Sequence, residues 1–460
     1  MDFSLPEDIV ALSDSVERFA KTEILPAMGA YEDRGTFPHS IIEKMGDAGF
    51  FGAAFPESLG GSDAGFMAVS VISETISRLA PEFGYAMNMQ AMTCPFTIFN
   101  WGREDQVARF VPELITGRKI GMFALSESGG GSDAAGSMKT TAVRDGDVYR
   151  LNGSKQWITF ANAADTGILF AKTDPAAGHR GVSAFIVEPK SYDGFTANPI
   201  PMTGLSNALC SNAVFLDDFV VPLKNRLGEE GEGFKIAMNA LEYGRLTVSS
   251  RSVGLAQACL DQAVEYANDR VVGGSPIGEY QMVQHLIADM TTNIAAARLL
   301  VHRMAWLMDR GEASNRAASL AKYAAVNAAK HAASSAAEIF AGYALADEYP
   351  IKKITAYVNM LAVGEGTPNV QRILIAEDTL GIKDANRHPV RNRLRAPGQG
   401  PIAALGQEFY LGRGADGLWQ SRSRRAGNLG GHRGLSQYGL DSRQPRNRFL
   451  GRRQDPARGG

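Results

Sequence analysis

Hydrophobic residues recur with a helical period through most of the first 120 residues. The residues that share one helical face within 7–25 are Ile9, Leu12, Val16, Phe19 and Ala20. The stretch 49–65, rich in Gly and Ser, predicts a loop, and helical spacing returns over 66–80 and 104–117. The pattern therefore predicts an N-terminal α-helical domain over residues 1–118.

The pattern changes near Lys119. From there to residue 230, short runs rich in β-branched and aromatic residues alternate with turns, one of them at Asp145-Gly146. These runs are IGMFALS, MKTTAVR, DVYRLNG, KQWITF, TGILFAK, GVSAFIVE and SNAVFLDDFVV. Short strands joined by tight turns predict a central β-sheet or β-barrel domain over residues 119–230.

Long helical runs without internal proline follow from Phe234. They cover 234–270, 281–310 and 315–344, and the third is dominated by alanine, which favours helix and lets helices approach closely. An antiparallel bundle is the simplest packing of such runs, so we expect a C-terminal four-helix-bundle domain over 231–385. The predicted fold class is α+β multidomain, in the order α, β, α.

The last segment, 386–460, differs in composition from the rest. It holds fifteen arginines, no lysine and four acidic residues, whereas the remainder of the chain carries 32 basic and 45 acidic side chains. Because it lacks an apolar period, it cannot offset its ordering entropy by burial, and we expect it to be mostly disordered. A nucleic-acid-binding tail is the alternative, which the absence of a regular motif disfavours. A GC-rich gene read in the wrong frame would also give this composition.

Composition excludes several other classes of protein. The three cysteines are far apart and form no CxxC pair, and the seven histidines form no HExxH motif. We therefore expect neither a disulfide framework nor a metal site. The N-terminus lacks the regions of a signal peptide, and no apolar run approaches the roughly 20 residues that span a bilayer. These features favour a cytoplasmic protein without a membrane segment.

Three short segments carry candidate chemistry. In FALSESGGGSD (123–133), three glycines allow a ligand to approach the backbone, although a flexible turn is the alternative. In KQWITF (155–160), Trp157 beside Thr159 can pack on a flat cofactor ring, although a core tryptophan is the usual explanation. In VGEGTPNVQR (363–372), glycines leave the Glu365 carboxylate unobstructed, although a lone glutamate is more often a solvated surface residue.

The order and spacing of these three segments resemble the acyl-CoA dehydrogenase family over roughly residues 3–382. The segments YANDR and PIGEYQ (266–281) are similar to an Arg…Gln pair that follows the first long bundle helix of that family. The resemblance implies non-covalent FAD, an acyl-CoA substrate, an electron-transfer flavoprotein as electron acceptor and a homotetramer.

The resemblance also implies contacts at individual residues. Contacts with FAD are implied for Phe123, Leu125, Ser126, Gly131, Ser132, Trp157, Ile158, Thr159, Arg270, Gln281, Glu338, Ile339, Gly342, Thr367 and Asn369. Among these, Arg270 and Gln281 would reach the cofactor from a neighbouring subunit, and Glu338 stands where the family usually has Gln. Contacts with acyl-CoA are implied for Ser132, Glu242, Tyr243, Gly244, Arg245 and Gly366.

Glu365 matches the catalytic base of the family. Some members carry their base one residue before the match of Arg245, but this chain has Gly244 there, which cannot act. A dry pocket raises the pKa of a carboxyl group and brings its basicity closer to that of the weakly acidic α-C–H of a thioester. We therefore expect Glu365 to remove the α-proton while the flavin takes the β-hydrogen as hydride.

The chain departs from the family pattern at several positions. Ala356 and Tyr357 stand where an Arg-Asp pair is usual, Gly364 replaces a common tyrosine, and Gly273 a common phenylalanine. The arginine that marks glutaryl-CoA enzymes is absent from 83–90, which disfavours a dicarboxylyl substrate. An acyl carrier protein thioester, a different flavin reaction and a non-catalytic flavoprotein relic remain as alternatives. Retention of Glu365 argues against the relic.

Overall fold

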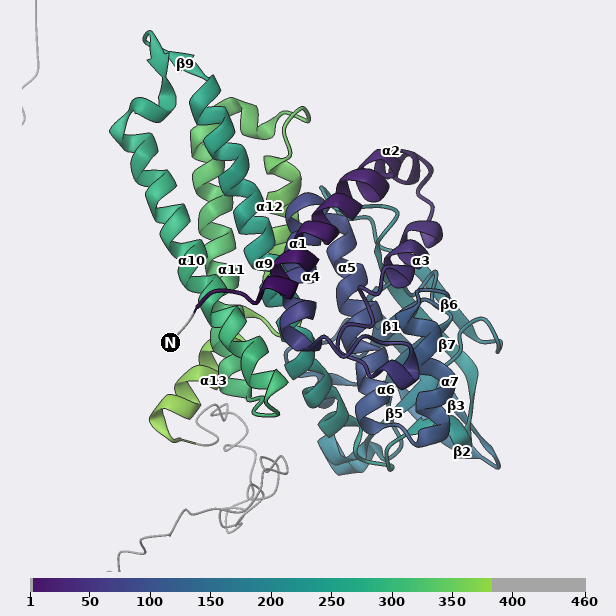
Figure 1. Ribbon diagram of the computed structural model, residues 1–460. Coiled ribbons are helices and arrows are strands. Elements are labelled where there is room, and N and C mark those ends of the chain that lie inside the picture. The colour runs from purple at the N-terminus through teal and green to yellow at the C-terminus, as the bar shows by residue number, and fades with distance from the viewer. Residues whose placement is uncertain (1–2, 383–460) are drawn as a thin grey trace, which may run out of the picture. The chain divides into compact units, whose positions relative to one another are not determined.

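The computed structural model describes residues 3–382, which form helices, then a sheet, then helices again (Figure 1). This order confirms the predicted α, β, α fold class. The segment 386–460, for which we expected disorder, lies outside the described residues.

The N-terminal helices are interrupted by two π-helical segments. The helices are α1 (Glu7–Phe19), α2 (Leu25–Arg34), α3 (His39–Asp47), α4 (Gly65–Leu79), α5 (Gly84–Ala86), α6 (Pro95–Trp101) and α7 (Glu104–Ile115). One π-helical segment, Ala20–Ile24, joins α1 to α2, and the other, Met87–Thr93, joins α5 to α6. The predicted loop at 49–65 is confirmed up to the start of α4, apart from the short 3-10 turn Glu57–Leu59. Because π-helical turns are rare and occur often at functional sites, Met87–Thr93 is a candidate part of a site.

The sheet holds eight strands in the order β6-β7-β3-β2-β4-β5-β8, with β1 pairing in parallel with β4. The strands are β1 (Gly121–Ala124), β2 (Thr141–Asp145), β3 (Val148–Thr159), β4 (Thr166–Lys172), β5 (Val182–Val187), β6 (Phe195–Pro199), β7 (Ser211–Pro222) and β8 (Arg226–Leu227). A short helix, α8 (Ala134–Ser137), precedes β2. The expected turn at Asp145-Gly146 is confirmed, because Asp145 of β2 pairs with Val148 of β3.

The two faces of the sheet belong to two different cores. Along β4, Ile168 and Phe170 pack in the core shared with the helices, whereas Leu169 and Ala171 face a second core formed by the strands and their connecting loops. This alternation follows from the period of two in a strand. At the start of β1, the Oε1 of Gln90 accepts a 2.6 Å hydrogen bond from the backbone N–H of Gly121. The π-helical segment is thereby fixed to the sheet.

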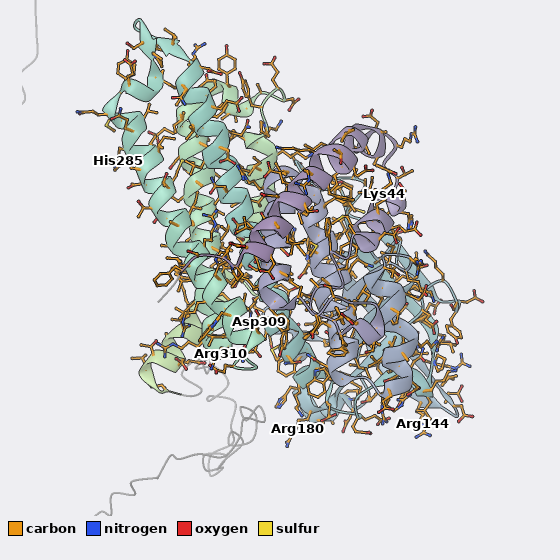
Figure 2. The ribbon with its side chains drawn as sticks, viewed as in Figure 1. Lys44, Arg144, Arg180, His285, Asp309 and Arg310 are labelled. Atoms are coloured by element: carbon orange, nitrogen blue, oxygen red, sulfur yellow. The ribbon has the colours of Figure 1, made fainter. Side chains whose placement is uncertain are left out.

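The C-terminal part is a bundle of long helices (Figure 1). It contains α9 (Gly233–Asp269), α10 (Gln281–Asp309), α11 (Asn315–Phe340), α12 (Ile351–Val363) and α13 (Pro368–Leu380), with a hairpin of β9 (Val271–Val272) and β10 (Ser275–Pro276) between α9 and α10. The alanine-rich α11 buries its small side chains, which permits close packing against α9. Asp309, labelled in Figure 2, accepts hydrogen bonds from the backbone N–H groups of Phe66 and Met67 and so ties α10 to α4.

Candidate active site

Glu365 lies in the turn between α12 and α13, in a backbone conformation that few L-residues adopt. Its φ is +54°, and that of Gly366 is +93°. The Nε of Arg245 on α9 donates to the Glu365 carbonyl (3.3 Å), and the Nε2 of Gln371 on α13 donates to the Gly366 carbonyl (3.0 Å). Such conformations cost free energy and persist where the surrounding structure imposes them. The position of Glu365 is therefore set by two other elements of the fold.

Lys322 supports the same turn from α11. Its side chain is buried, and its Nζ donates to the carbonyls of Gly364 and Gly366, on either side of Glu365. Burial lowers the pKa of Lys322, while the negative charge of Glu365 acts to raise it. A buried ammonium thus lies close to the carboxylate that the sequence singled out.

The carboxylate of Glu365 is enclosed and only half satisfied. Its Oε1 accepts a 3.2 Å hydrogen bond from the Nδ2 of Asn88, whose Oδ1 accepts one of 2.6 Å from the Thr247 hydroxyl. Its Oε2 is buried without a partner among residues 3–382, although other atoms of the residue are partly accessible. Burial raises the pKa of Glu365, and the Asn88 hydrogen bond and nearby cationic side chains oppose that rise. The free oxygen can accept a proton from a ligand.

Gly244 lies directly against this carboxylate. A Cβ atom at position 244 would come within 3.0 Å of the Cδ and Oε2 of Glu365 and 2.9 Å of the Thr93 Cγ2. These separations are shorter than van der Waals contact, so any larger side chain at 244 would displace the carboxylate or Thr93. The glycine therefore leaves the space that Glu365 occupies.

An exposed tryptophan stands at a bulge of β3. Trp157 is 57% exposed and has a φ of +65°, and the pairing of β3 with β7 shifts register between Lys155 and Ile158. A bulge re-aims side chains and is common beside functional sites. Trp157 is therefore not the core tryptophan of the alternative explanation, and its indole is available to a flat ligand ring. Thr159 is half-buried two residues further on.

A buried ion pair joins this bulge to the Gly-rich segment. The Nζ of Lys155 lies 2.9 Å from the Oε1 of Glu127 and donates to the Leu125 carbonyl (3.2 Å). Glu127 also accepts hydrogen bonds from the backbone N–H groups of Lys139 and Thr140. The pair fixes residues 125–127 beside the strand that carries Trp157.

The residues of the Gly-rich segment differ in what they can offer a ligand. Ser132 is exposed, and a Cβ atom at Gly131 would meet no atom within 4 Å, so the backbone there is open. Phe123 and Ser126 are half-buried. Leu125 and Ile158 are buried in the two cores, so a ligand contact there would use their backbone atoms. An open glycine backbone beside an exposed indole fits a large planar cofactor such as FAD.

Three of the residues expected to contact FAD line a hollow at the hairpin end of the bundle. Arg270, Ile339 and Gly342 border this hollow of about 560 Å³, where the guanidinium of Arg270 lies 5.6 Å from the centre of the Tyr343 ring. Gln281, the first residue of α10, and Glu338 are exposed. In Figure 1 this hairpin lies at the opposite end of the bundle from α13.

The remaining predicted residues lie in the N-terminal third of α9 and around the start of α13. Glu242 is partly buried, which raises its pKa, and the charge of Arg245 opposes that rise. The ring of Tyr243 packs 4.7 Å from that of Phe96. Thr367 caps α13 by accepting from the backbone N–H of Val370, and Asn369 is exposed.

Sequence reasoning missed three buried polar residues of this site: Asn88, Lys322 and Arg251. A signal existed for Lys322, because a lysine on the apolar face of an alanine-rich helix needs a partner when that face packs. No comparable pattern marked Asn88, which lies 277 positions from Glu365.

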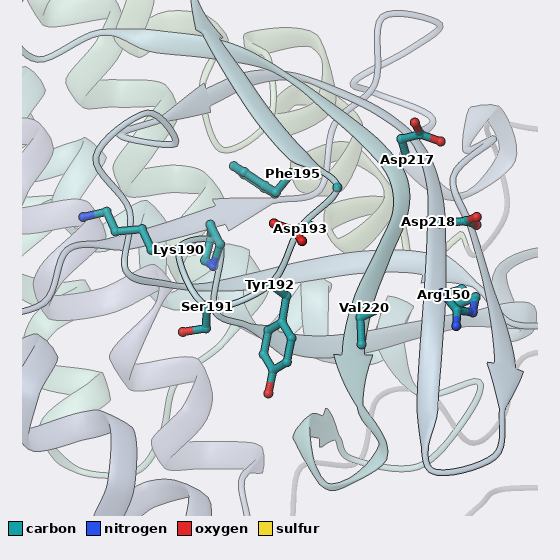
Figure 3. A pocket seen from close by; sticks show the side chains of 11 residues that line it. Arg150, Lys190, Ser191, Tyr192, Asp193, Phe195, Asp217, Asp218 and Val220 are labelled. Atoms are coloured by element: carbon teal, nitrogen blue, oxygen red, sulfur yellow. The ribbon is translucent and has the colours of Figure 1, made fainter.

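Other parts of the described chain offer no comparable grouping of the predicted site residues. A polar hollow of about 700 Å³ lies on the sheet, bordered by Arg150, Lys190 and Asp217 among others, and holds none of the predicted site residues (Figure 3). Within residues 3–382, no group of three or more His, Cys, Asp or Glu side chains is placed to hold a metal ion. No helix of that range has the length and apolar character to cross a membrane.

Comparisons with known proteins give consistent matches along the chain. Models of the N-terminal, middle and C-terminal domains of acyl-CoA dehydrogenase match residues 6–118, 122–218 and 231–380. Glutaryl-CoA dehydrogenase of Desulfococcus multivorans is 37% identical over 391 residues, covering 84% of this chain and 100% of that protein. An acyl-CoA dehydrogenase of Bacillus subtilis (strain 168) is 38% identical over 376 residues, covering 82% of this chain and 98% of that protein.

Solved structures agree with these matches. The structure of a glutaryl-coenzyme A dehydrogenase in complex with glutaryl-CoA superposes with a TM-score of 0.80 at 37% identity, covering 84% of this chain and 98% of that one. Butyryl-CoA dehydrogenase of Megasphaera elsdenii superposes with a TM-score of 0.79 at 32% identity, covering 83% of this chain and 100% of that one. The chain belongs to the acyl-CoA dehydrogenase family of FAD-dependent oxidoreductases.

Proposed function

We propose that this enzyme oxidises an acyl-CoA to the 2-enoyl-CoA, with Glu365 as the base that removes the α-proton. The observation that carries the proposal is the buried Oε2 of Glu365, which has no partner among residues 3–382. Burial raises the pKa of this carboxyl, so its ionised form is a stronger base than an exposed carboxylate. The Asn88 hydrogen bond orients the other oxygen and leaves Oε2 free for the substrate.

The backbone N–H of Glu365 supports the same step. It donates to no acceptor among the described residues. In the proposed complex it donates to the thioester carbonyl oxygen, where negative charge develops as the α-proton leaves. The strained turn, held by Lys322 and Arg245, keeps this donor and the carboxylate on one residue in a fixed relation.

FAD would be held by the Gly-rich segment and the β3 bulge, with Gly131 and Ser132 open to its polar groups and Trp157 against its ring. When bound, it accepts the β-hydrogen of the substrate as hydride. Thr367 and Asn369 lie beside Glu365 in sequence and would contact the same cofactor.

We further propose that FAD binds between two copies of the chain, within a homotetramer. Gly244, beside Glu365, and Arg270, at the hairpin hollow, are 26 residues apart on one continuous helix and its cap. At 1.5 Å per residue they are separated by roughly 39 Å, farther than one dinucleotide cofactor extends. If both places contact FAD, the hollow that serves this Glu365 therefore comes from a neighbouring subunit.

The proposed electron acceptor is an electron-transfer flavoprotein. One relative, 38% identical, is the caffeyl-CoA reductase-Etf complex subunit CarC of Acetobacterium woodii. A similar solved chain, with a TM-score of 0.79 and 35% identity, belongs to a study of the electron transferring flavoprotein of Acidaminococcus fermentans. These neighbours support an acceptor of the same class for this enzyme.

The test is anaerobic titration of the FAD-loaded enzyme with a panel of acyl-CoAs, followed by flavin absorbance, beside the Glu365→Gln variant. We expect the wild type to be bleached by at least one acyl-CoA. The variant should bind FAD and acyl-CoA but reduce the flavin about 10²–10⁴ times more slowly, because an amide cannot accept the proton. Near-normal reduction by Glu365→Gln would remove Glu365 from this role. The same acyl groups on acyl carrier protein test the alternative carrier.

A further inference from the structure

A third buried cation, besides Lys322 and Arg245, lies near Glu365 and has no counter-charge of its own among residues 3–382. Arg251 of α9 is 2% exposed, and its Nε is buried without a hydrogen-bond partner among residues 3–382. One face of the guanidinium lies over the Tyr85 ring, at 4.7 Å from the centroid. A cation–π contact satisfies the face of a guanidinium, but the N–H groups at its edge still need acceptors.

The other cations of the site are engaged. The NH1 of Arg245 donates to the Asn315 Oδ1 (3.1 Å), and Lys322 donates to two carbonyls. Among residues 3–382, Arg251 forms no ion pair, and Glu365 is the only carboxylate whose charge affects the pKa of Arg251. A buried, unpaired guanidinium is costly to maintain, so it calls for an acceptor that arrives with a ligand.

The position of Arg251 suits the far end of an acyl chain. Gly244, which touches the Glu365 carboxylate, lies seven residues before Arg251, so both are on one face of α9. The two are separated by two helical turns, roughly 10 Å. In the proposed function the thioester lies at Glu365 and hence beside Gly244, so Arg251, two turns further along α9, lies away from the thioester end.

The lack of a side chain at Gly84 leaves room for the Arg251 guanidinium. A Cβ atom at Gly84 would fall 2.6 Å from the Arg251 Nε and 2.4 Å from the Ser77 Oγ. The Ser77 hydroxyl is also buried without a partner in the described part of the chain, so two polar groups that lack hydrogen bonds converge beside Gly84. Tyr357 also lies near Arg251, and the centre of its ring is 6.1 Å from the centre of the Tyr85 ring. Polar groups at this end would be poorly suited to a purely hydrocarbon chain.

We propose that Arg251 binds a carboxylate at the far end of the acyl chain, so that the substrate is a short dicarboxylyl-CoA monothioester. This inference rests on the proposed function and names its substrate class. The absence of an arginine from residues 83–90 led us to expect that a dicarboxylyl substrate is disfavoured. The present proposal reverses that expectation, because Arg251 of α9 supplies the cation instead. A carboxylate accepts two hydrogen bonds from a guanidinium edge, which is geometrically specific.

The test compares kcat/KM for two matched pairs, glutaryl-CoA with pentanoyl-CoA and adipyl-CoA with hexanoyl-CoA, in the FAD-loaded enzyme. We expect the carboxylate member to exceed its neutral partner by about tenfold or more in at least one pair, the scale of a charge-assisted hydrogen bond. Arg251→Met should reduce this ratio by about tenfold or more, and Arg251→Lys should retain part of it.

Arg298→Met is the matched control, since Arg298 on the neighbouring α10 is paired with Glu74 at 2.8 Å and Gln257 at 2.9 Å. It should lower the melting temperature and leave the substrate ratio unchanged. Preference of the wild type for the neutral member of both pairs overturns the proposal while leaving the proposed function intact, whether or not Arg251→Met folds. An Arg251→Met effect that is equal for both members of a pair also overturns it, since that would indicate a general electrostatic role. If no acyl-CoA reduces the flavin, both proposals fall.

Discussion

At the scale of single residues, the site couples one carboxylate to buried cations that do not touch it. Lys322 donates to the carbonyls on both sides of Glu365 and not to its carboxylate, so it acts on the base through charge and through backbone position. Burial raises the pKa of Glu365, and the charge of Lys322 limits the rise. The proposed base must be ionised to remove a proton, so we expect these opposing effects to set the pH at which the enzyme becomes active.

Lys322→Met should therefore move the acid limb of the pH profile of flavin reduction to higher pH. Without the cation the pKa of Glu365 rises further, so a higher pH is needed to ionise it. Two carbonyls also lose their donor, which should destabilise the fold by about 1–3 kcal/mol each. Lys330→Met, an exposed change on the same helix, is the control. A lower melting temperature with an unshifted pH profile would limit Lys322 to a structural role.

The sequence located Glu365, Trp157 and the open glycines of this site because each lies in a short local motif. It could mark Lys322 as a buried lysine but not name its partner, and it could not locate Asn88 or Arg251. The relation of these three residues to Glu365 exists only after distant helices pack together. The sequence also did not decide whether Trp157 packs in the core or contacts a ligand. That choice depends on the bulge of β3, where the register with β7 shifts, and register is a property of two strands and not of one.

At the scale of elements, the Lys155–Glu127 pair connects β3 to the Gly-rich segment. Both side chains are buried, and burial lowers the pKa of Lys155 to about 8. Lys155→Met should destabilise the protein by about 3–5 kcal/mol, because it leaves the Glu127 carboxylate buried without its cation. It should also speed FAD loss, since the segment is no longer held beside Trp157.

Thermal melting and FAD retention during dialysis measure both effects. Arg150→Met is the control on the same strand: its 2.9 Å pair with Asp145 is largely exposed, and such pairs contribute about 0–1 kcal/mol. If the two substitutions change the melting temperature and FAD retention equally, the buried Lys155–Glu127 pair contributes no more to stability or FAD binding than an exposed pair.

The periodicity of the sequence predicted the long elements well and the short ones poorly. The runs over 234–270, 281–310 and 315–344 correspond to α9, α10 and α11, because a helix of that length repeats its apolar face many times. The strand β6 was not predicted, since Phe195–Pro199 is only five residues long and ends in proline. The π-helical segment Met87–Thr93 was not predicted either, because all of its residues are buried and no solvent-facing side marks a helical period.

At the scale of the whole molecule, FAD binding and assembly should depend on each other. If the hairpin hollow serves the active site of a neighbouring subunit, Arg270→Ala should weaken both FAD retention and the oligomer. Light scattering with and without FAD, combined with flavin release on dilution, measures the coupling. Arg118→Ala, an exposed change in the N-terminal part, is the control. A monomer that keeps FAD fully bound would contradict the shared site.

Gly244 lies against the Glu365 carboxylate, and the space between them holds only one side chain. This limits the order in which substitutions at positions 244 and 365 can occur during evolution. If Glu365 is the base, as proposed, a lineage that first gained a carboxylate at position 244 would crowd that base. One that lost Glu365 first would have no base at all. Either order passes through generations of poor turnover, so selection for activity holds the base in its present segment unless both codons change together. The absence of a Cβ atom at position 244 thus favours keeping the carboxylate at position 365.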